Sequence, residues 1–171
     1  MIRPAAGDRA VAEPRACERL AALCGHLPLA LDILARKLVE RPHVPLRSIA
    51  ALLADPRAAL DWLRVGDLSV QESLGSACAW LGQDARDVLD RLAALPGQGP
   101  VAWACGQVGG IGGRVAEESI VELADAGLIR HGDEAGAFQL DPLVRAFALN
   151  AAPALRRMRA ADLGARELTA R

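Results

Sequence analysis

The sequence contains no tyrosine, and aromatic residues make up only 3% of its 171 positions. β-Branched residues are also few beside the many alanines and leucines, and such a composition favours helix over sheet. Lysine occurs once, at Lys37, so nearly every positive charge is an arginine. This usage is typical of a GC-rich bacterial coding sequence. We therefore expect a mainly α protein of one domain or two small ones.

A metal site is not expected, because the sequence has no C-x-x-C pair and no cluster of histidines. The residues concerned are Cys17, Cys24, Cys78, Cys105, His26, His43 and His131. We expect the thiols to be reduced and mostly buried.

Long apolar runs are also missing. None approaches the ~18 residues of a membrane-spanning helix, and no signal peptide precedes the first predicted helix. The formal net charge of −1 argues against a globally basic nucleic-acid binder, although it leaves room for a local basic patch. These features predict a cytoplasmic protein with no membrane partner.

Catalytic and phosphate-binding motifs are absent as well. No G-x-x-x-x-G-K-[ST] occurs, Lys37 lies inside a predicted helix, and no strand followed by an acidic pair supplies a magnesium site. Cys24 and His26 are close in sequence, but Cys24 lies on the apolar face of its helix, as a structural thiol would. The stretch "GQVGGIGGR" has Val115 where a dinucleotide-binding loop needs its third glycine. We predict no enzyme activity in this chain.

The first half of the chain predicts a helical subdomain over residues 13–65, after a flexible lead-in over 1–12. Pro14 begins a helix, Gly25 ends it as a left-handed cap, and Pro28 begins the next. A third helix is expected from Leu46 to Ala54. Asp55 followed by proline predicts the cap and first turn of a fourth.

The second half predicts a winged-helix domain over residues 68–150 and a C-terminal helix within 151–171. Ser69 and Asp84 are the predicted helix caps. The element order is helix, helix, short helix, helix, two-stranded β-ribbon, helix. The predicted elements are helices ending near Leu81 and Leu95, a short helix from Val101 to Cys105, a glycine-rich connection from Gly106 to Gly113, a helix from Arg114 to Ala126, strands at Leu128–Arg130 and Ala137–Leu140, and helices beginning at Pro142 and Pro153.

The stretch "CGHLPLALDILARKL" resembles the GLPL-type motif of the NB-ARC, or STAND, signal-transduction ATPases. The matching residues are Gly25, Leu27, Pro28, Leu29 and Ala30. The segments "ARDVLDRLAALPG" and "LVRAFA" are similar to the opening and closing helices of the family's winged helix. The resemblance covers about residues 8–150, and the members it points to are bacterial transcriptional regulators.

The resemblance implies where a nucleotide would lie. In the family, the proline of the GLPL-type motif packs beside the adenine ring, so Gly25, Leu27 and Pro28 are nucleotide-proximal by resemblance. A Met-His-Asp triplet senses the ADP phosphate, and it aligns here with Leu140, Asp141 and Pro142. A carboxylate would repel a phosphate and proline has no backbone donor, so the resemblance implies a degenerate phosphate sensor.

These observations lead to one interpretation of function and two alternatives. The chain is interpreted as a non-catalytic regulatory module with a protein partner, coupling a nucleotide switch to an effector by domain docking. ATP or ADP would act only if another segment or chain supplies the ATPase core. The first alternative is a DNA-binding winged helix, although Glu117, Glu118, Glu122 and Asp125 on the recognition-position helix oppose phosphate binding. The second is a stand-alone interaction or oligomerisation module, for which the arginine-rich C-terminal segment is a candidate docking helix.

Overall fold

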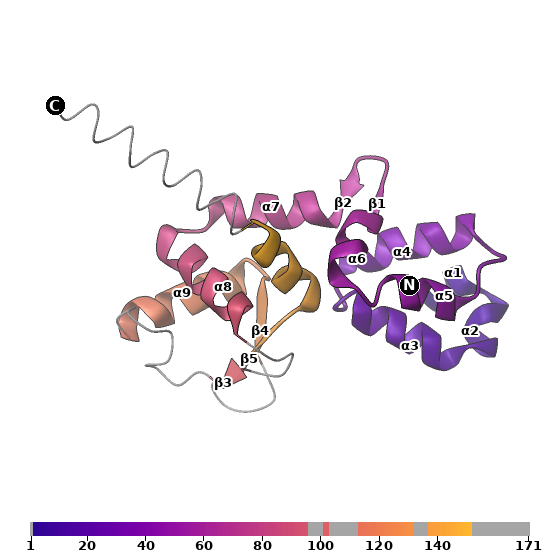
Figure 1. Ribbon diagram of the computed structural model, residues 1–171, viewed down its shortest axis with the longest axis horizontal. Helices are drawn as coiled ribbons and strands as arrows, with labels where there is room; N and C mark the ends of the chain where they lie inside the picture. Colours follow the sequence, from indigo (N-terminus) through magenta and orange to yellow (C-terminus); the bar gives the residue numbers. More distant parts are fainter. Residues whose placement is uncertain (1, 96–100, 103–112, 132–136, 152–171) are drawn as a thin grey trace.

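A computed structural model describes residues 2–95, 101–102, 113–131 and 137–151. Figure 1 shows two lobes joined through one helix, α7 (Val70–Trp80). We call them the N-terminal lobe (residues 2–69) and the C-terminal lobe (residues 70–151). The fold is mainly helical with small antiparallel sheets, as predicted.

Four helices of the N-terminal lobe lie where the sequence predicts them. Three begin at a proline, which loses no useful N–H at the first helical position. The cap of α6 is also as predicted, since the Asp55 carboxylate accepts a 3.0 Å hydrogen bond from the backbone N–H of Arg57. The helices are α3 (Pro14–Leu23), α4 (Pro28–Glu40), α5 (Leu46–Leu52) and α6 (Pro56–Trp62).

The prediction of a flexible lead-in over residues 1–12 is wrong for the part that the structure describes. Residues 2–12 form two short helices, α1 (Ile2–Ala6) and α2 (Asp8–Ala12). Helix α1 packs along α4, and Ile2 and Ala6 are buried in the core. Five-residue helices are unstable alone, so these two are held by tertiary contacts that local sequence does not reveal.

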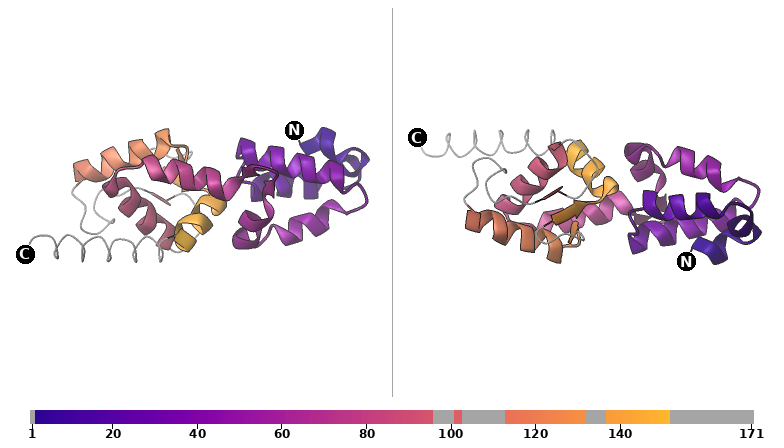
Figure 2. Two further views of the ribbon diagram at one scale, coloured as in Figure 1. Left: turned by 90° about the horizontal axis from the view of Figure 1, so that it is seen from above. Right: turned by 90° about the horizontal axis from the view of Figure 1, so that it is seen from below.

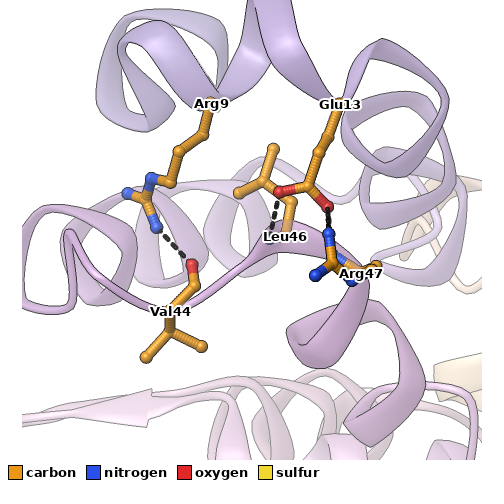
Figure 3. Close-up of polar contacts among 5 residues, drawn as sticks. All are labelled: Arg9, Glu13, Val44, Leu46 and Arg47. Carbon is orange, nitrogen blue, oxygen red and sulfur yellow. Dashed lines mark hydrogen bonds and ion pairs between the residues drawn. The ribbon is translucent and has the colours of Figure 1, made fainter.

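Arg9 holds α2 to the segment that connects α4 and α5. Its guanidinium donates hydrogen bonds to the carbonyl oxygens of Leu38 (2.7 Å), Arg41 (3.0 Å) and Val44 (2.8 Å); Figure 3 shows the contact with Val44. These carbonyls lie where prolines end the regular hydrogen bonding of α4. The forked side chain therefore satisfies acceptors that would otherwise have no helical partner.

Glu13 makes the corresponding contact at the start of α5. Its carboxylate oxygens accept hydrogen bonds from the backbone N–H groups of Leu46 and Arg47, both 3.1 Å long. The Arg47 guanidinium lies 3.5 Å from the same carboxylate (Figure 3). Glu13 thus acts as a remote cap for a helix whose own N-cap is Pro45, a residue with no polar side chain.

A short hairpin closes the N-terminal lobe. Strands β1 (Arg64–Val65) and β2 (Leu68–Ser69) pair around Gly66, which has φ = +54°. Gly66 followed by Asp67 is a turn signal in the sequence, but the two strands were not predicted. Ser69 then caps α7 as predicted, since its hydroxyl accepts a 3.3 Å hydrogen bond from the N–H of Glu72.

The C-terminal lobe continues with α8 (Gln83–Ala94), α9 (Gly113–Asp125) and a helix over residues 142–151. The prediction that Asp84 caps α8 is wrong. The N-cap is Gly82, and Asp84 lies in the first turn, where a carboxylate still favours the helix dipole. The helix over residues 142–151 is fastened to the end of α8 by Arg145, which donates to the carbonyls of Ala93 (3.0 Å) and Leu95.

The sheet of the C-terminal lobe has three strands in the order β3-β5-β4, all antiparallel. Strands β4 (Ile129–His131) and β5 (Ala137–Leu140) confirm the predicted ribbon. The predicted short helix from Val101 to Cys105 is wrong at its start, because Val101–Ala102 form β3 and pair with β5. The glycine-rich connection and the helix from Pro153 lie outside the described residues.

Buried apolar side chains from both lobes form one continuous cluster. Leucines contribute most of its volume, and the sparse aromatics very little. The largest fully buried side chains are Leu20, Ile33, Leu34, Leu38, Leu46, Leu53, Leu63, Leu123, Leu128, Leu143, Val88 and Val144. Among the residues that the structure describes, no helix is long and apolar enough to span a bilayer.

Candidate functional site

The Gly25 segment leaves α3 in a conformation that few residues can adopt. Gly25 has φ = +59° and His26 has φ = +55°, so both lie in the left-handed region. The Gly25 N–H donates to the carbonyl of Ala22 (2.9 Å) and the His26 N–H donates to that of Ala21 (3.1 Å). This pair of bonds is a Schellman motif, which satisfies the last carbonyls of α3 and turns the chain toward Pro28.

Asp141 begins the helix over residues 142–151. One carboxylate oxygen, Oδ1, accepts a 2.8 Å hydrogen bond from the N–H of Leu143, as an N-cap does. The side chain is buried, and Oδ2 has no hydrogen-bond partner among the described residues. The nearest positive group is the Arg130 guanidinium, whose Nη2 lies 3.6 Å from Oδ2.

Gly25 and Asp141 meet where the two lobes touch. A Cβ atom built on Gly25 would lie 1.5 Å from Oδ2 of Asp141 and 2.1 Å from its Cγ. Real Cβ contacts are never this short, so the carboxylate fills the space that a side chain at position 25 would need. The segment that resembles the GLPL-type motif and the segment that aligns with the phosphate sensor are therefore in direct contact.

Burial controls the protonation of this junction. It raises the pKa of the Asp141 carboxyl above its ordinary value of 3.8, although the Leu143 N–H, Arg130 and His26 act in the opposite direction. Burial, together with the nearby Asp141 charge, raises the pKa of the Cys24 thiol to about 12. A thiol with this pKa is not a nucleophile at neutral pH, which agrees with the structural role predicted for Cys24.

Two clefts open on the junction. The larger, of about 440 Å³, lies beside Asp141 and carries the basic side chains of Arg19, His26 and Arg130. The smaller, of about 180 Å³, has Leu27 and Pro28 on one side and Val70 and Leu74 of α7 on the other. Gly25, Leu27 and Pro28 of the N-terminal lobe thus line clefts that also contain residues of the C-terminal lobe.

The structure brings together five of the six residues that the sequence singles out. Gly25, Asp141 and Pro142 line the larger cleft, and Leu27 and Pro28 line the smaller one. The sixth, Leu140, is buried at the end of β5. Sequence reasoning did not identify Arg19, His26 and Arg130 as neighbours of Asp141, because no spacing rule links α3 to β4.

The described residues contain no group of three His, Cys, Asp or Glu side chains that could hold a metal ion. The polar groups that line the larger cleft are mainly guanidinium and imidazole groups, which suit an anion rather than a cation. What the arrangement offers chemically is a buried carboxylate, a tight glycine contact and a basic rim.

No protein-family model matches the chain, and no solved structure matches it. Two curated proteins are similar to it. Regulatory protein AfsR of Streptomyces griseus is 30% identical over 141 residues, which cover 82% of this chain. Regulatory protein AfsR of Streptomyces coelicolor is 28% identical over 141 residues. The chain spans 14% of the length of each relative, so the similarity links it to one part of a bacterial regulatory protein.

Proposed function

We propose that this chain is a non-catalytic regulatory module that couples the state of a nucleotide-binding core, or of another protein partner, to an effector by docking of its two lobes. The observation that carries the proposal is the contact between Gly25 and Asp141. It joins the two segments that resemble the nucleotide-responsive motifs of STAND ATPases. The similarity to two proteins named as regulatory proteins also supports a regulatory role.

The chemistry of the junction favours docking over nucleotide sensing. The basic rim of Arg19, His26 and Arg130 would attract an anion to the cleft. A phosphate that reached the sensor position itself would meet the buried Asp141 carboxylate, and Pro142 offers no N–H to bind it. The space next to Gly25 is already filled by the carboxylate. In this proposal the side chain of Asp141 takes over a contact between the lobes that would otherwise depend on a ligand.

The strand order of the C-terminal lobe supports its assignment as a winged helix. Strand β3 follows α8, strands β4 and β5 follow α9, and β5 lies between β3 and β4. In a winged helix, the first strand is expected to pair with the last one, as β3 pairs with β5 here, and α9 would be the helix in the recognition position. Helices α8 and α9 pack against each other, as the two helices of such a unit would.

A titration tests the proposal directly. The full chain should show no tight heat-detected binding of ATP or ADP, with or without magnesium. Tight, magnesium-dependent binding would contradict it, because the triphosphate would then be held by this chain unaided. Addition of a phosphate-loop ATPase segment from a related regulator should restore nucleotide binding only in the mixture.

DNA binding is the second candidate function. The exposed side of α9 carries Glu117, Glu118 and Asp125 against one basic residue, Arg114. Carboxylates there oppose the release of counterions that drives binding to phosphates. A gel shift whose affinity falls steeply with salt would favour this candidate over the docking module, and no shift at low salt would remove it.

A further inference from the structure

Helix α9 has an exposed stripe of acidic and apolar side chains that makes no contact in the core of either lobe. Glu117, Glu118, Val121 and Asp125 follow helical spacing and are all exposed. Val121 is 59% exposed, so the stripe has an apolar centre between carboxylates. The Glu118 carboxylate lies 3.8 Å from the Arg114 guanidinium, and both side chains are largely exposed. Such a pair contributes little and is easily replaced.

The N-terminal lobe has a cleft of complementary character between α3 and α5. Its volume is about 300 Å³. Three arginines line it, Arg15 and Arg19 from α3 and Arg47 from α5, and the other lining residues are Ala16, Ala50 and Ala51. Guanidinium groups therefore stand beside a surface of methyl groups.

The positive charge of this cleft is only partly neutralised. Arg47 lies 3.5 Å from the Glu13 carboxylate, whereas Arg15 and Arg19 have no carboxylate within 4.0 Å among the described residues. These two like charges are one helical turn apart and repel each other. Glu18 is on the same helix but does not line the cleft. An external anion would relieve this repulsion.

We propose that the acidic stripe of α9 in one copy of this chain docks into the arginine-lined cleft of a second copy. The forked guanidinium groups of Arg15 and Arg19 would pair with Glu118 and Asp125. Val121 would lie against the alanines, where burial of its methyl groups adds to the attraction. Helix α9 has 13 residues, so its length of about 20 Å suits a groove between two helices.

A second copy is the occupant that the charges and the geometry favour. Helices α3 and α9 belong to different lobes (Figures 1 and 2), and α9 is packed on α8 within its own lobe, so the α9 of one molecule cannot fill that molecule's own cleft. A nucleic acid would satisfy the guanidinium groups but would bring phosphates, which have no apolar part for the alanines. The contact is heterologous, so it builds chains or rings of copies.

The test is the mass of the full chain in solution, measured by light scattering or sedimentation over a wide concentration range. We expect the mass to rise with concentration at about 0.05 M salt and to return to that of the monomer at about 0.5 M, because salt screens the charge pairs. A mass that stays monomeric throughout, or an association that salt does not weaken, would overturn the proposal.

Two variants locate the contact. Arg15→Gln with Arg19→Gln removes the cleft charges, and Glu118→Gln with Asp125→Asn removes those of the stripe. Each pair should weaken association at least tenfold, with an unchanged circular dichroism spectrum. A mixture of the two variants should give a 1:1 dimer that does not grow, because each partner keeps one intact surface. The matched changes Arg57→Gln and Asp61→Asn on α6 should have no effect.

The outcomes separate this proposal from the proposed function. The docking of α9 into the cleft would be refuted if the cleft variant still associated, or if the mixture of the two variants failed to dimerise. A gel shift with duplex DNA that the cleft variant abolishes would assign the cleft to nucleic acid instead. None of these results changes the expected absence of tight nucleotide binding.

Discussion

Oδ2 of Asp141 lies 1.5 Å from the position that a Cβ atom on Gly25 would occupy. One residue ends a helix of the N-terminal lobe and the other begins a helix of the C-terminal lobe. Two helix caps, the backbone of Gly25 and the side chain of Asp141, thus also meet each other between the lobes. The close approach needs glycine on one side and a short, buried carboxylate on the other.

Replacement of Gly25 by alanine should destabilise the chain strongly. Alanine with φ near +59° costs about 1–2 kcal/mol, and displacement of the Asp141 carboxylate adds an overpacking cost. We expect a loss of about 3 kcal/mol or more in the free energy of unfolding, measured by urea denaturation.

Gly127→Ala is the matched control. Gly127 has φ = +69° and ends α9 with the same pair of backbone hydrogen bonds that end α3 at Gly25. Nothing lies within 4 Å of a Cβ atom built on Gly127, so only the conformational cost of about 1–2 kcal/mol applies. In an Asp141→Ala background, Gly25→Ala should cost no more than the control. Equal losses for Gly127→Ala and Gly25→Ala in the wild-type background would show that the contact with Asp141 is not tight.

The helices around Gly25 could be predicted because their signals are local. Pro14, Gly25 and Pro28 each fix the backbone within a residue or two of the helix end that they mark. The β4–β5 ribbon was predictable for a related reason, since two apolar stretches of sequence flank a short stretch that contains Gly132 and Gly136.

The rest depends on contacts between distant residues. Helices α1 and α2 are too short to be stable without α4 and the Arg9 fork, so local pattern indicated an unstructured segment. Strand β3 has only two residues, and its partner lies far along the chain. The contact of Gly25 with Asp141, and the basic rim formed by Arg19 and Arg130, required the docking of the lobes.

The stability of the chain should depend on pH through Asp141. Burial raises its pKa above 3.8 in the folded state, so the folded chain holds this proton more tightly than the unfolded chain does. The stabilising contribution of the protonated carboxyl is fully present below pH 3.8 and is lost as pH rises through the raised pKa. Asp141→Asn cannot ionise, and asparagine still caps a helix.

We therefore expect the free energy of unfolding of Asp141→Asn, relative to that of the wild type, to increase as pH rises from below 3.8 to 7. Urea denaturation at a series of pH values measures the difference. The control Asp55→Asn changes a carboxylate that also caps a helix but is exposed. It therefore separates the effect of burying the carboxylate from the effect of losing it as a cap. A difference between wild type and Asp141→Asn that stays constant with pH would refute the prediction.

The cysteines should differ in their reactivity toward alkylating reagents. The pKa of Cys24 is raised to about 12 by burial and by Asp141, and its side chain is fully buried. Cys78 is only half-buried, although burial also raises its pKa. In native buffer at neutral pH we expect Cys78 to be labelled before Cys24, and Cys24 only at the rate of unfolding, as mass spectrometry of the peptides would show. Rapid native labelling of Cys24 would mean that the junction opens often.

Loss of the Arg9 fork should release the N-terminal helices from the segment between α4 and α5. Arg9→Ala removes donors to the carbonyls of Leu38, Arg41 and Val44, and hydrogen bonds from a charged donor are each worth about 1.5–3 kcal/mol. Water can reach some of these carbonyls, so we expect a total loss of about 2–3 kcal/mol in urea denaturation. The same variant should also accelerate hydrogen exchange in α1 and α2.

Arg9→Lys separates the fork from the charge. A lysine ammonium keeps the positive charge but cannot reach three diverging carbonyls from one planar group. Its loss of stability should therefore be close to that of Arg9→Ala, whereas Arg3→Ala, which alters an exposed arginine of α1, should cost less than about 0.5 kcal/mol. If Arg9→Lys were as stable as the wild type, charge alone would hold these helices, and the geometry of the fork would be irrelevant to the lobe.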